Sequence, residues 1–218
     1  MSQRFDLIVF DWDGTLMDSA AAIVYALQNA CRDLGYPVPD AQRARHVIGL
    51  SLRDAMAHIC PDLRPADYDK LIERYRFHWF AQDAHLPLFG GAAEMLAELE
   101  ERGHLLAVAT GKSRAGLARV LESTGLKPRF VATRCADQCT PKPAPDMLLE
   151  LMDELGAERE RTLMIGDTTH DLGMAANAGV AAVAVTYGAH PADELQRMAP
   201  LALVDSVAGL QQWLRRHA

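Results

Sequence analysis

Residues 8–19 read IVFDWDGTLMDS, an apolar run that ends in two acidic side chains. Such a run is typical of a buried strand, and in an extended chain side chains two positions apart point the same way. Asp11 and Asp13 therefore face one spot, whereas Trp12 faces the other side, and Gly14 lets the chain turn sharply after them. Two carboxylates at one spot repel each other and resist desolvation, so the spot needs a cation or a proton.

Strand-like and helix-like segments alternate along most of the chain. Apolar, β-rich runs occupy residues 5–11, 105–110, 130–133, 162–167, 181–186 and 201–205. Amphipathic segments follow several of them, each closed by a glycine that stops a helix, at residues 92–102, 113–124, 145–155 and 172–178. Strands that are continuously apolar belong to a parallel sheet covered on both faces. The sequence therefore predicts an α/β fold with a doubly wound, Rossmann-like parallel sheet.

A long insertion interrupts this alternation after the first strand. Residues 17–86 contain no convincing strand, only helix-like runs at 20–34 and 66–80, and they are too many for a simple crossover. We expect residues 1–16 and 87–218 to form the catalytic core and residues 17–86 to form a helical cap domain. An insert that leaves the core just after a reactive strand end is placed to act as a lid.

Bulk composition limits the classes of partner. The chain has 218 residues and a net charge of −7, which argues against a general nucleic-acid surface. No signal-like N-terminal segment or membrane-length apolar run is present in this sequence. The four cysteines suit a reducing compartment. We expect a cytoplasmic protein, a monomer or weak dimer, without nucleic-acid or membrane partners.

Polar side chains follow several of the expected strands. Thr110 ends the second strand and opens a helix, Lys142 lies between two prolines, and Asp167 and Asp171 follow the fourth strand. Ligands of open parallel sheets bind beyond the carboxyl ends of the strands, so these side chains are expected at one edge.

The residue types at this edge fit phosphoryl transfer. Asp11, Asp13 and Asp167 offer the oxygen ligands that Mg²⁺ prefers. Thr110 at a helix start offers a hydroxyl beside backbone N–H groups, and Lys142 supplies a point charge for phosphate. A metal, cationic donors and a nucleophile are what phosphoryl transfer requires.

Four short motifs resemble those of a known family. They are DWDGTL at residues 11–16, ATGKS at 109–113, KPAPD at 142–146 and GDTTHD at 166–171. In this order they resemble the motifs of the haloacid dehalogenase superfamily of phosphotransferases, most closely its phosphoglycolate phosphatase-like branch. The resemblance covers essentially the whole chain and includes a helical cap between the first two motifs.

The resemblance implies roles for three aspartates. Asp11 would be the nucleophile that becomes an aspartyl phosphate, and Asp13 would protonate the leaving oxygen and then activate water. Mg²⁺ would be held by the Asp11 side chain, the Asp13 backbone carbonyl and Asp167. Dehalogenases of this superfamily lack an acid at the place of Asp13, so haloacid chemistry is not expected.

The same resemblance implies supporting roles for the other motif residues. Thr110 and Lys142, with the backbone of Gly111, would bind the transferring phosphoryl oxygens. Asp171 would act through a metal-bound water or by orienting Lys142.

These roles leave three hypotheses about function. The first is a Mg²⁺-dependent phosphatase of a small phosphorylated metabolite, with 2-phosphoglycolate as the leading candidate. The second is a phosphomutase resembling β-phosphoglucomutase, which shares Asp11 and Asp13. The third is a binding protein without catalysis on a retained fold, and the presence of all the key polar residues argues against it.

The expected cap contains one polar cluster near a glycine. Residues 45–56, RHVIGLSLRDAM, hold Arg45, His46, Gly49 and Arg53, where the resemblance places a specificity loop. We expect Arg45 and Arg53 to bind the substrate; the alternative is that they solvate helix faces.

Other polar residues near the motifs are expected to have simpler roles. Lys112 is expected to be solvated or at the rim of the site, and Asp18 and Ser19 are expected to cap the first helix of the insert. His170 is expected at the surface rim, and ordinary exposed positions are expected for His104, His190 and His217.

Overall fold

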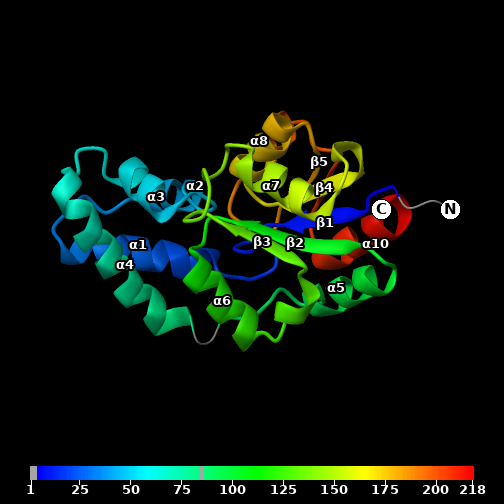
Figure 1. Ribbon diagram of the computed structural model, residues 1–218. Coiled ribbons are helices and arrows are strands. Elements are labelled where there is room, and N and C mark those ends of the chain that lie inside the picture. The colour runs from blue at the N-terminus through cyan, green and yellow to red at the C-terminus, as the bar shows by residue number, and fades with distance from the viewer. Residues whose placement is uncertain (1–3, 84–85) are drawn as a thin grey trace.

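The computed structural model describes residues 4–83 and 86–218. Within these ranges six parallel strands form one sheet in the order β3-β2-β1-β4-β5-β6 (Figure 1). The strands are β1 (Leu7–Phe10), β2 (Leu105–Thr110), β3 (Ala132–Cys135), β4 (Thr162–Gly166), β5 (Ala181–Val185) and β6 (Ala202–Val204). The predicted doubly wound parallel sheet is confirmed. Residues 1–3 of the expected core and 84–85 of the expected cap lie outside the described residues.

Helices cover both faces of the sheet because successive strand residues point to opposite sides. Ile8 and Phe10 face one cluster and Leu7 and Val9 the other, and all four are buried. The first face is covered by α5 (Ala92–Glu101), α6 (Arg114–Ser123) and α10 (Val207–His217). The second is covered by α7 (Asp146–Leu155) and α8 (Thr169–Ala178). Figure 1 shows these two sets on opposite sides of the sheet, and α9 (Ala192–Arg197) packs beside β6.

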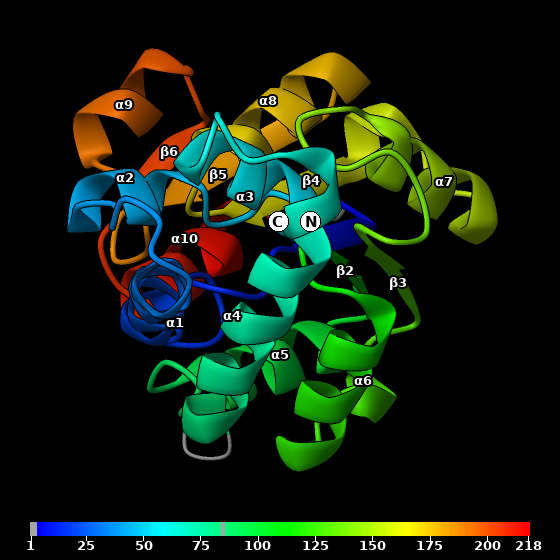
Figure 2. The same ribbon diagram turned by 90° about the vertical axis from the view of Figure 1, so that its left-hand side faces the viewer.

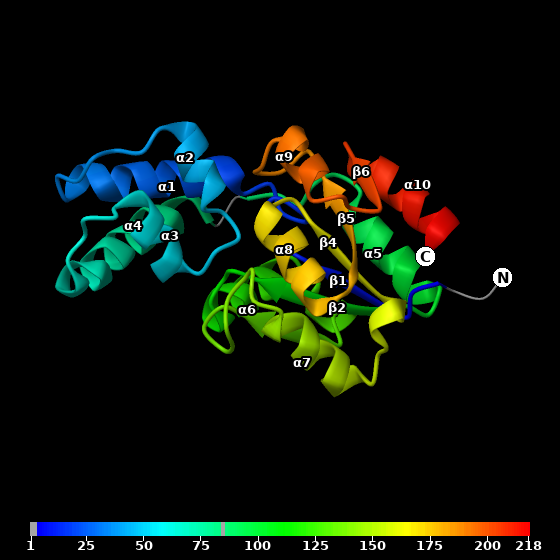
Figure 3. The same ribbon diagram turned by 90° about the horizontal axis from the view of Figure 1, so that it is seen from above.

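A second group of helices lies beyond the carboxyl ends of the strands. It consists of α1 (Ala20–Asp33), α2 (Ala41–His46), α3 (Leu52–Ile59) and α4 (Tyr68–Asp83). These helices share a hydrophobic cluster of their own, and Figures 2 and 3 show them in front of the strands and beyond one end of the sheet. The expected helical insert is therefore present, while the domain boundaries that we placed at its ends remain predictions.

The two connections between this helical group and the sheet run side by side. The backbone N–H of Asp18 donates to the carbonyl of Pro87 at 3.0 Å, and that of Phe89 donates to the carbonyl of Leu16 at 2.9 Å. Met17 and Leu88 form an isolated antiparallel bridge between them. The helices α1–α4 are thus attached through one narrow, paired neck.

Several element boundaries differ from the sequence-based expectation by one to three residues, and two of the differences have a clear local cause. Helix α8 begins at Thr169, three residues earlier than expected, because Thr168 and Asp171 form a capping box. Strand β3 begins at Ala132 rather than Phe130, because a 3₁₀ turn ends at Arg129 and the chain is still entering the sheet. Short 3₁₀ helices occur at Pro65–Asp67, Lys127–Arg129 and Arg159–Arg161.

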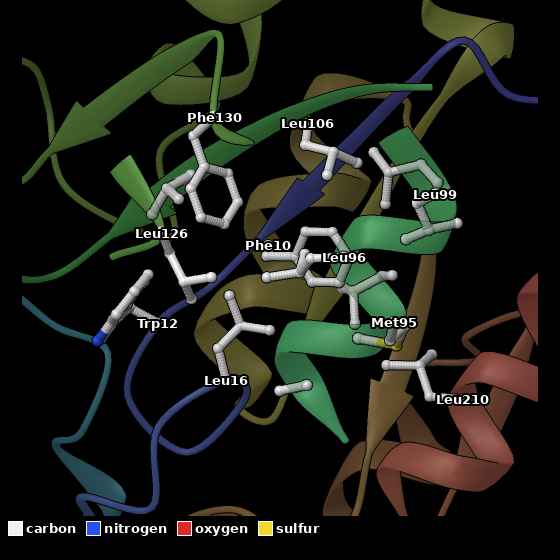
Figure 4. Close-up of a cluster of buried hydrophobic side chains, with 14 of the residues drawn as sticks. Phe10, Trp12, Leu16, Met95, Leu96, Leu99, Leu106, Leu126, Phe130 and Leu210 are labelled. Carbon is white, nitrogen blue, oxygen red and sulfur yellow. The ribbon is translucent and has the colours of Figure 1, made fainter. Parts of the chain in front are cut away.

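The larger core packs around the first strand and the turn after it (Figure 4). Phe10 is fully buried, and Trp12 meets Phe130 edge to face with ring centroids 6.2 Å apart. Trp12 therefore anchors the underside of the reactive turn, as the alternation of side chains predicted.

Replacing Phe10 with alanine is expected to lower the free energy of unfolding by about 3–5 kcal/mol, because it opens a cavity in this core. Chemical denaturation monitored by circular dichroism measures the change. Phe77, which is 60% exposed, provides the matched control: Phe77→Ala is expected to change stability by less than about 0.5 kcal/mol. Equal losses in the two variants would contradict this account of the core.

Candidate active site

The polar residues of the four motifs meet at the carboxyl edge of the sheet. Asp11 follows β1, Thr110 ends β2 and Asp167 follows β4, and all three are buried. Strand β1 lies between β2 and β4, so the helices leave the sheet on opposite sides at this point. Such a switch point is where ligands of open α/β sheets bind.

Lys142 lies between two carboxylates at the base of the site. Its Nζ is 2.7 Å from Oδ1 of Asp11 and 2.6 Å from Oδ1 of Asp171, and its side chain is fully buried. Burial alone would lower the pKa of Lys142, but the two carboxylates raise it above its ordinary value, so the side chain is an ammonium. The expectation that Asp171 orients Lys142 agrees with this contact.

The second oxygen of Asp11 remains unused. Oδ2 is buried and has no hydrogen-bond partner among the described residues. Burial raises the pKa of Asp11 to about 7, the Lys142 ammonium opposes the rise, and the charges of Asp171 and Asp13 add to it. Asp11 therefore presents one anchored oxygen and one free oxygen.

Asp167 is fixed from two sides. Its Oδ1 accepts a hydrogen bond from the Thr15 hydroxyl at 2.8 Å, and its Oδ2 accepts one from the backbone N–H of Ala189 at 2.7 Å. A Cβ atom at Gly14 would overlap this carboxylate, and the φ of +81° at Gly14 also favours glycine. Burial, together with the charges of Asp11 and Asp171, raises the pKa of Asp167.

Three carboxylates form a group that can hold a cation. Ligand oxygens of Asp11, Asp167 and Asp171 lie within 4.8 Å of one another, and all three residues are buried. One ammonium, Lys142, contacts two of these acids, so negative charge is in excess. The free oxygen of Asp11 and this excess charge fit a hard divalent cation such as Mg²⁺.

The Asp13 carboxylate lies outside this group and has its own partners. Its Oδ1 accepts a hydrogen bond from the Ser19 hydroxyl at 2.6 Å, and its Oδ2 lies 3.0 Å from Nζ of Lys112. Asp13 was predicted as a metal ligand through its backbone carbonyl. The carboxylate is thus paired with Ser19 and Lys112 rather than with the acidic group.

Two residues around Asp13 differ in part from expectation. Ser19 occupies the N-cap position of α1, as expected, but its side chain makes no capping hydrogen bond and binds Asp13 instead. Lys112 was expected to be solvated or at the rim, yet only 10% of its side chain is exposed. The ammonium lies 4.5 Å from the ring centre of Trp79 on α4, an attractive cation–π contact.

The turn after β2 meets the loop between α2 and α3. The Thr110 hydroxyl accepts a hydrogen bond from the backbone N–H of Lys112 at 3.2 Å. A Cβ atom at Gly111 would lie 2.5 Å from the carbonyl oxygens of both Gly49 and Leu50. Glycine at this position therefore permits direct backbone contact between the sheet edge and the helical group.

A cavity of about 860 Å³ lies between the sheet edge and α1–α4. Asp11, Asp13, Thr110 and Gly111 line it from the sheet, and Arg53 lines it from α3. Lys142 is buried behind Asp11 and is not among the described residues that line this cavity. Five of the predicted site residues thus line the cavity, and Lys142 lies behind Asp11.

Arg45 does not share this cavity, in contrast to the prediction that paired it with Arg53. One of its guanidinium nitrogens lies 3.4 Å from the carbonyl of Gly188, and the side chain lines a separate cavity of about 220 Å³. The reason is helical geometry: Arg45 is in the last turn of α2, on the side that faces α9. Arg53 instead stacks on Tyr68, with 4.9 Å between its Cζ and the ring centre.

Two histidines, His190 and His104, differ from expectation, whereas His217 is exposed as expected. His190 is buried rather than exposed, and its two ring nitrogens lie within hydrogen-bond distance of the Thr169 N–H and the His46 carbonyl. His46, His190 and Glu194 could otherwise group around a metal ion, but these bonds already use His190. Nε2 of the half-buried His170 lies 2.9 Å from the same carbonyl oxygen, and its expected place at the rim of the site stays a prediction.

His104 was also expected to be exposed and is buried instead. Its Nδ1 lies 2.9 Å from the carbonyl oxygen of Phe5, far from the acidic group along the first strand. His104 directly precedes β2, at the edge of the sheet where the strands begin. His104 is therefore structural.

Sequence reasoning missed two residues that support Asp167. Ala189 donates its backbone N–H to the carboxylate, and the Tyr187 hydroxyl donates to the Thr15 carbonyl at 3.0 Å. Burial raises the pKa of Tyr187 beyond its ordinary value, which keeps the hydroxyl protonated as a donor. The only signal was position: residues 187–190 follow β5, the strand next to β4.

No helix in the described part of the chain has both the length and the apolar character needed to cross a membrane.

The chain resembles proteins of one family along most of its length. The sequence profile of the haloacid dehalogenase-like hydrolase family matches residues 8–185. A relative named "Probable phosphatase IndB" from Dickeya dadantii is 40% identical over 207 residues, covering 92% of this chain and 89% of the relative. A phosphoglycolate phosphatase from Agrobacterium fabrum is 30% identical, covering 94% of this chain and 90% of the relative.

A solved structure supports the same assignment at the level of the fold. The crystal structure of a hydrolase from Pseudomonas syringae superposes with a TM-score of 0.89, covering 97% of this chain and 98% of that chain, at 23% identity. The four motifs, their meeting at one sheet edge and the profile match agree. The chain belongs to the haloacid dehalogenase-like hydrolase family.

Proposed function

We propose that this protein is a Mg²⁺-dependent phosphatase that hydrolyses the phosphate monoester of a small metabolite through an aspartyl-phosphate intermediate. One observation carries the proposal: Asp11 has an oxygen with no partner among the described residues, on a carboxylate that lines a cavity shared with Asp13. Membership of the family and the names of the two relatives support the reaction class.

In the first step, the free oxygen of Asp11 attacks phosphorus in line with the leaving oxygen. The Lys142 ammonium holds the other oxygen of Asp11 and offsets negative charge as the phosphoryl group arrives. Thr110 and the backbone of Gly111 border the same cavity and can donate to phosphoryl oxygens. The bond from phosphorus to the substrate oxygen breaks as the bond to Asp11 forms.

Asp13 handles the proton in both steps. Its carboxyl gives a proton to the departing alkoxide, and its carboxylate then takes one from the water that attacks the aspartyl phosphate. Ser19 and Lys112 hold this side chain beside Asp11 without blocking its exposure to the cavity. Inorganic phosphate leaves and Asp11 is restored.

Asp11 and Asp167, with the Asp13 backbone carbonyl, would hold Mg²⁺, and Asp171 would orient Lys142 from behind. The ion would supply charge neutralisation for the carboxylates and the phosphoryl oxygens. Without such a cation, three buried acids share one ammonium.

The proposal also covers the substrate, the cellular location and the oligomeric state. A small phosphorylated metabolite would bind in the 860 Å³ cavity, and 2-phosphoglycolate remains a candidate because one relative is named for it. We propose a cytoplasmic enzyme, a monomer or weak dimer, that binds neither nucleic acid nor membranes.

A panel of phosphorylated metabolites assayed with Mg²⁺ and ranked by kcat/KM tests the function. Turnover that depends on a sugar bisphosphate primer would indicate a phosphomutase instead.

Asp11→Asn is expected to reduce turnover by at least about 10⁴-fold, because an amide does not attack phosphorus, while the thermal unfolding temperature changes little. Phosphate release from an aryl phosphate measures the loss. Asp18→Asn, an exposed neutral replacement seven residues away, is the matched control and is expected to keep full activity. Residual activity of Asp11→Asn within about tenfold of the unsubstituted enzyme would refute the nucleophile.

Removing divalent metal with EDTA is expected to stop hydrolysis, and added Mg²⁺ is expected to restore it. Ca²⁺ is expected to support less turnover, because it is larger and accepts looser coordination. Metal analysis of the chelated protein accompanies the assay. Full activity in a preparation free of metal would contradict the proposed ligand set.

Arg53 and Arg45 form a natural pair for testing the cap. Because only Arg53 lines the main cavity, Arg53→Ala is expected to lower kcat/KM for a carboxylate-bearing phosphate by ~10²-fold, or roughly 3 kcal/mol. An uncharged aryl phosphate is expected to change little with Arg53→Ala, and neither substrate is expected to change with Arg45→Ala. If Arg53→Ala affects both substrates alike, the residue does not select charge.

A further inference from the structure

The two sides of the main cavity differ in polarity, although Arg53, Asp54 and Arg76 also line it from the helical side. The sheet contributes charged and hydroxyl side chains, among them Asp11, Asp13, Thr110 and Lys112. Most of the side chains from α1–α4 are apolar, including Leu27, Leu52, Ile72, Tyr75 and Trp79. The phosphoryl group belongs at the polar end, so the leaving alcohol faces the apolar end.

The size of the apolar end matters as much as its character. A volume of about 860 Å³ lies in the range of pockets that bury drug-sized ligands, about 300–1,000 Å³. A two-carbon alcohol such as glycolate would leave most of that volume to water against apolar walls, which is unfavourable. The cavity therefore fits an alcohol much larger than glycolate.

Two aromatic rings form part of this wall. Tyr75 and Trp79, one turn apart on α4, are nearly parallel, with an interplanar angle of 11° and centroids 6.2 Å apart. Both line the cavity, and Lys112 lies over the Trp79 ring at the junction with the polar end. Parallel rings at the wall of a pocket favour a planar ligand group, which can stack on them or meet their edges.

We infer that the substrate is the phosphate monoester of a bulky, largely apolar alcohol that carries an aromatic ring. The inference rests on the proposed phosphatase function and narrows its substrate class. It also ranks 2-phosphoglycolate below such esters, in contrast to the candidate that the motifs alone suggested. The ring lies against α4, and Asp13 protonates the oxygen that links it to phosphorus.

The test compares primary alkyl phosphates that share one kind of leaving oxygen and differ in size. Ethyl phosphate, 2-phosphoglycolate and 2-phenylethyl phosphate are assayed with Mg²⁺. We expect kcat/KM for 2-phenylethyl phosphate to exceed that for ethyl phosphate by ~10²-fold, from burial of the phenyl ring. Equal values, or a higher value for 2-phosphoglycolate than for 2-phenylethyl phosphate, would overturn the inference.

Matched variants locate the effect in the cavity. Ile72 and Val24 are both half-buried against the cluster of α1–α4, but only Ile72 lines the cavity. Ile72→Asn is expected to reduce the ratio of kcat/KM for 2-phenylethyl phosphate to that for ethyl phosphate at least ~10-fold. Val24→Asn is expected to keep the preference. Leu52→Asn, at a second half-buried wall position, replaces Ile72→Asn if thermal melting shows that the latter does not fold.

A binding measurement separates this inference from the proposed reaction. Calorimetric titration of Asp11→Asn with 2-phenylethyl phosphate and ethyl phosphate measures the same preference without turnover. Preferential binding of the phenylethyl ester by a protein that hydrolyses none of the esters, and no aryl phosphate, would refute the phosphatase and keep the aromatic site. Steady hydrolysis without any preference between the esters would refute the aromatic site and keep the phosphatase.

Discussion

The site depends on the buried ion pairs that the Lys142 ammonium forms with Asp11 and Asp171. A charged group without water must be compensated on all sides, and removing one partner of such an arrangement leaves an uncompensated charge. Strand β1 delivers Asp11, helix α8 delivers Asp171, and the segment before α7 delivers Lys142. The contact therefore joins three parts of the chain, of which the first and last, Asp11 and Asp171, lie 160 residues apart. It also determines which oxygen of Asp11 is free.

Chemistry and selectivity occupy different parts of this molecule. Residues of the sheet edge provide the nucleophile, the proton-transfer group and the metal ligands in the proposed mechanism. The helices α1–α4 provide most of the apolar wall and Arg53. Contact between them is close: Gly111 meets the backbone of Gly49 and Leu50, and Lys112 touches both Asp13 and Trp79. In the proposed mechanism, substitutions in the apolar wall would alter the alcohol that binds, while Lys142 on the sheet side keeps Asp11 in place.

The sequence predicted the structure best where the local pattern of apolar residues matches the burial of the segment in the fold. Strand β2 was predicted without error, because a continuously apolar run of that length has few alternatives in a parallel sheet. Asp11 and Asp167 could be placed at one edge because every parallel strand ends there. The directions of Lys112 and Arg45 could not be predicted, since each depends on a side chain or carbonyl distant in the sequence. Ser19 lies only six residues from its partner Asp13, but their contact depends on the turn between them. Burial of His190 depends likewise on the packing of α2 against the loop after β5.

The position of β1 in the middle of the sheet has a consequence for how this chain folds. Its neighbours are β2 and β4, so Leu7 pairs with Leu105 and Thr162, and neither edge of β1 can be satisfied by nearby sequence. Contacts between residues so distant cost loop entropy before they contribute stability, and chains dominated by them fold slowly. The paired neck at residues 16–18 and 87–89 offsets part of this cost, because it brings the ends of the helical insertion together. Once the neck has formed, the loop that must close between β1 and β2 is effectively shorter. The remaining entropy cost of pairing β1 with β2 is then smaller.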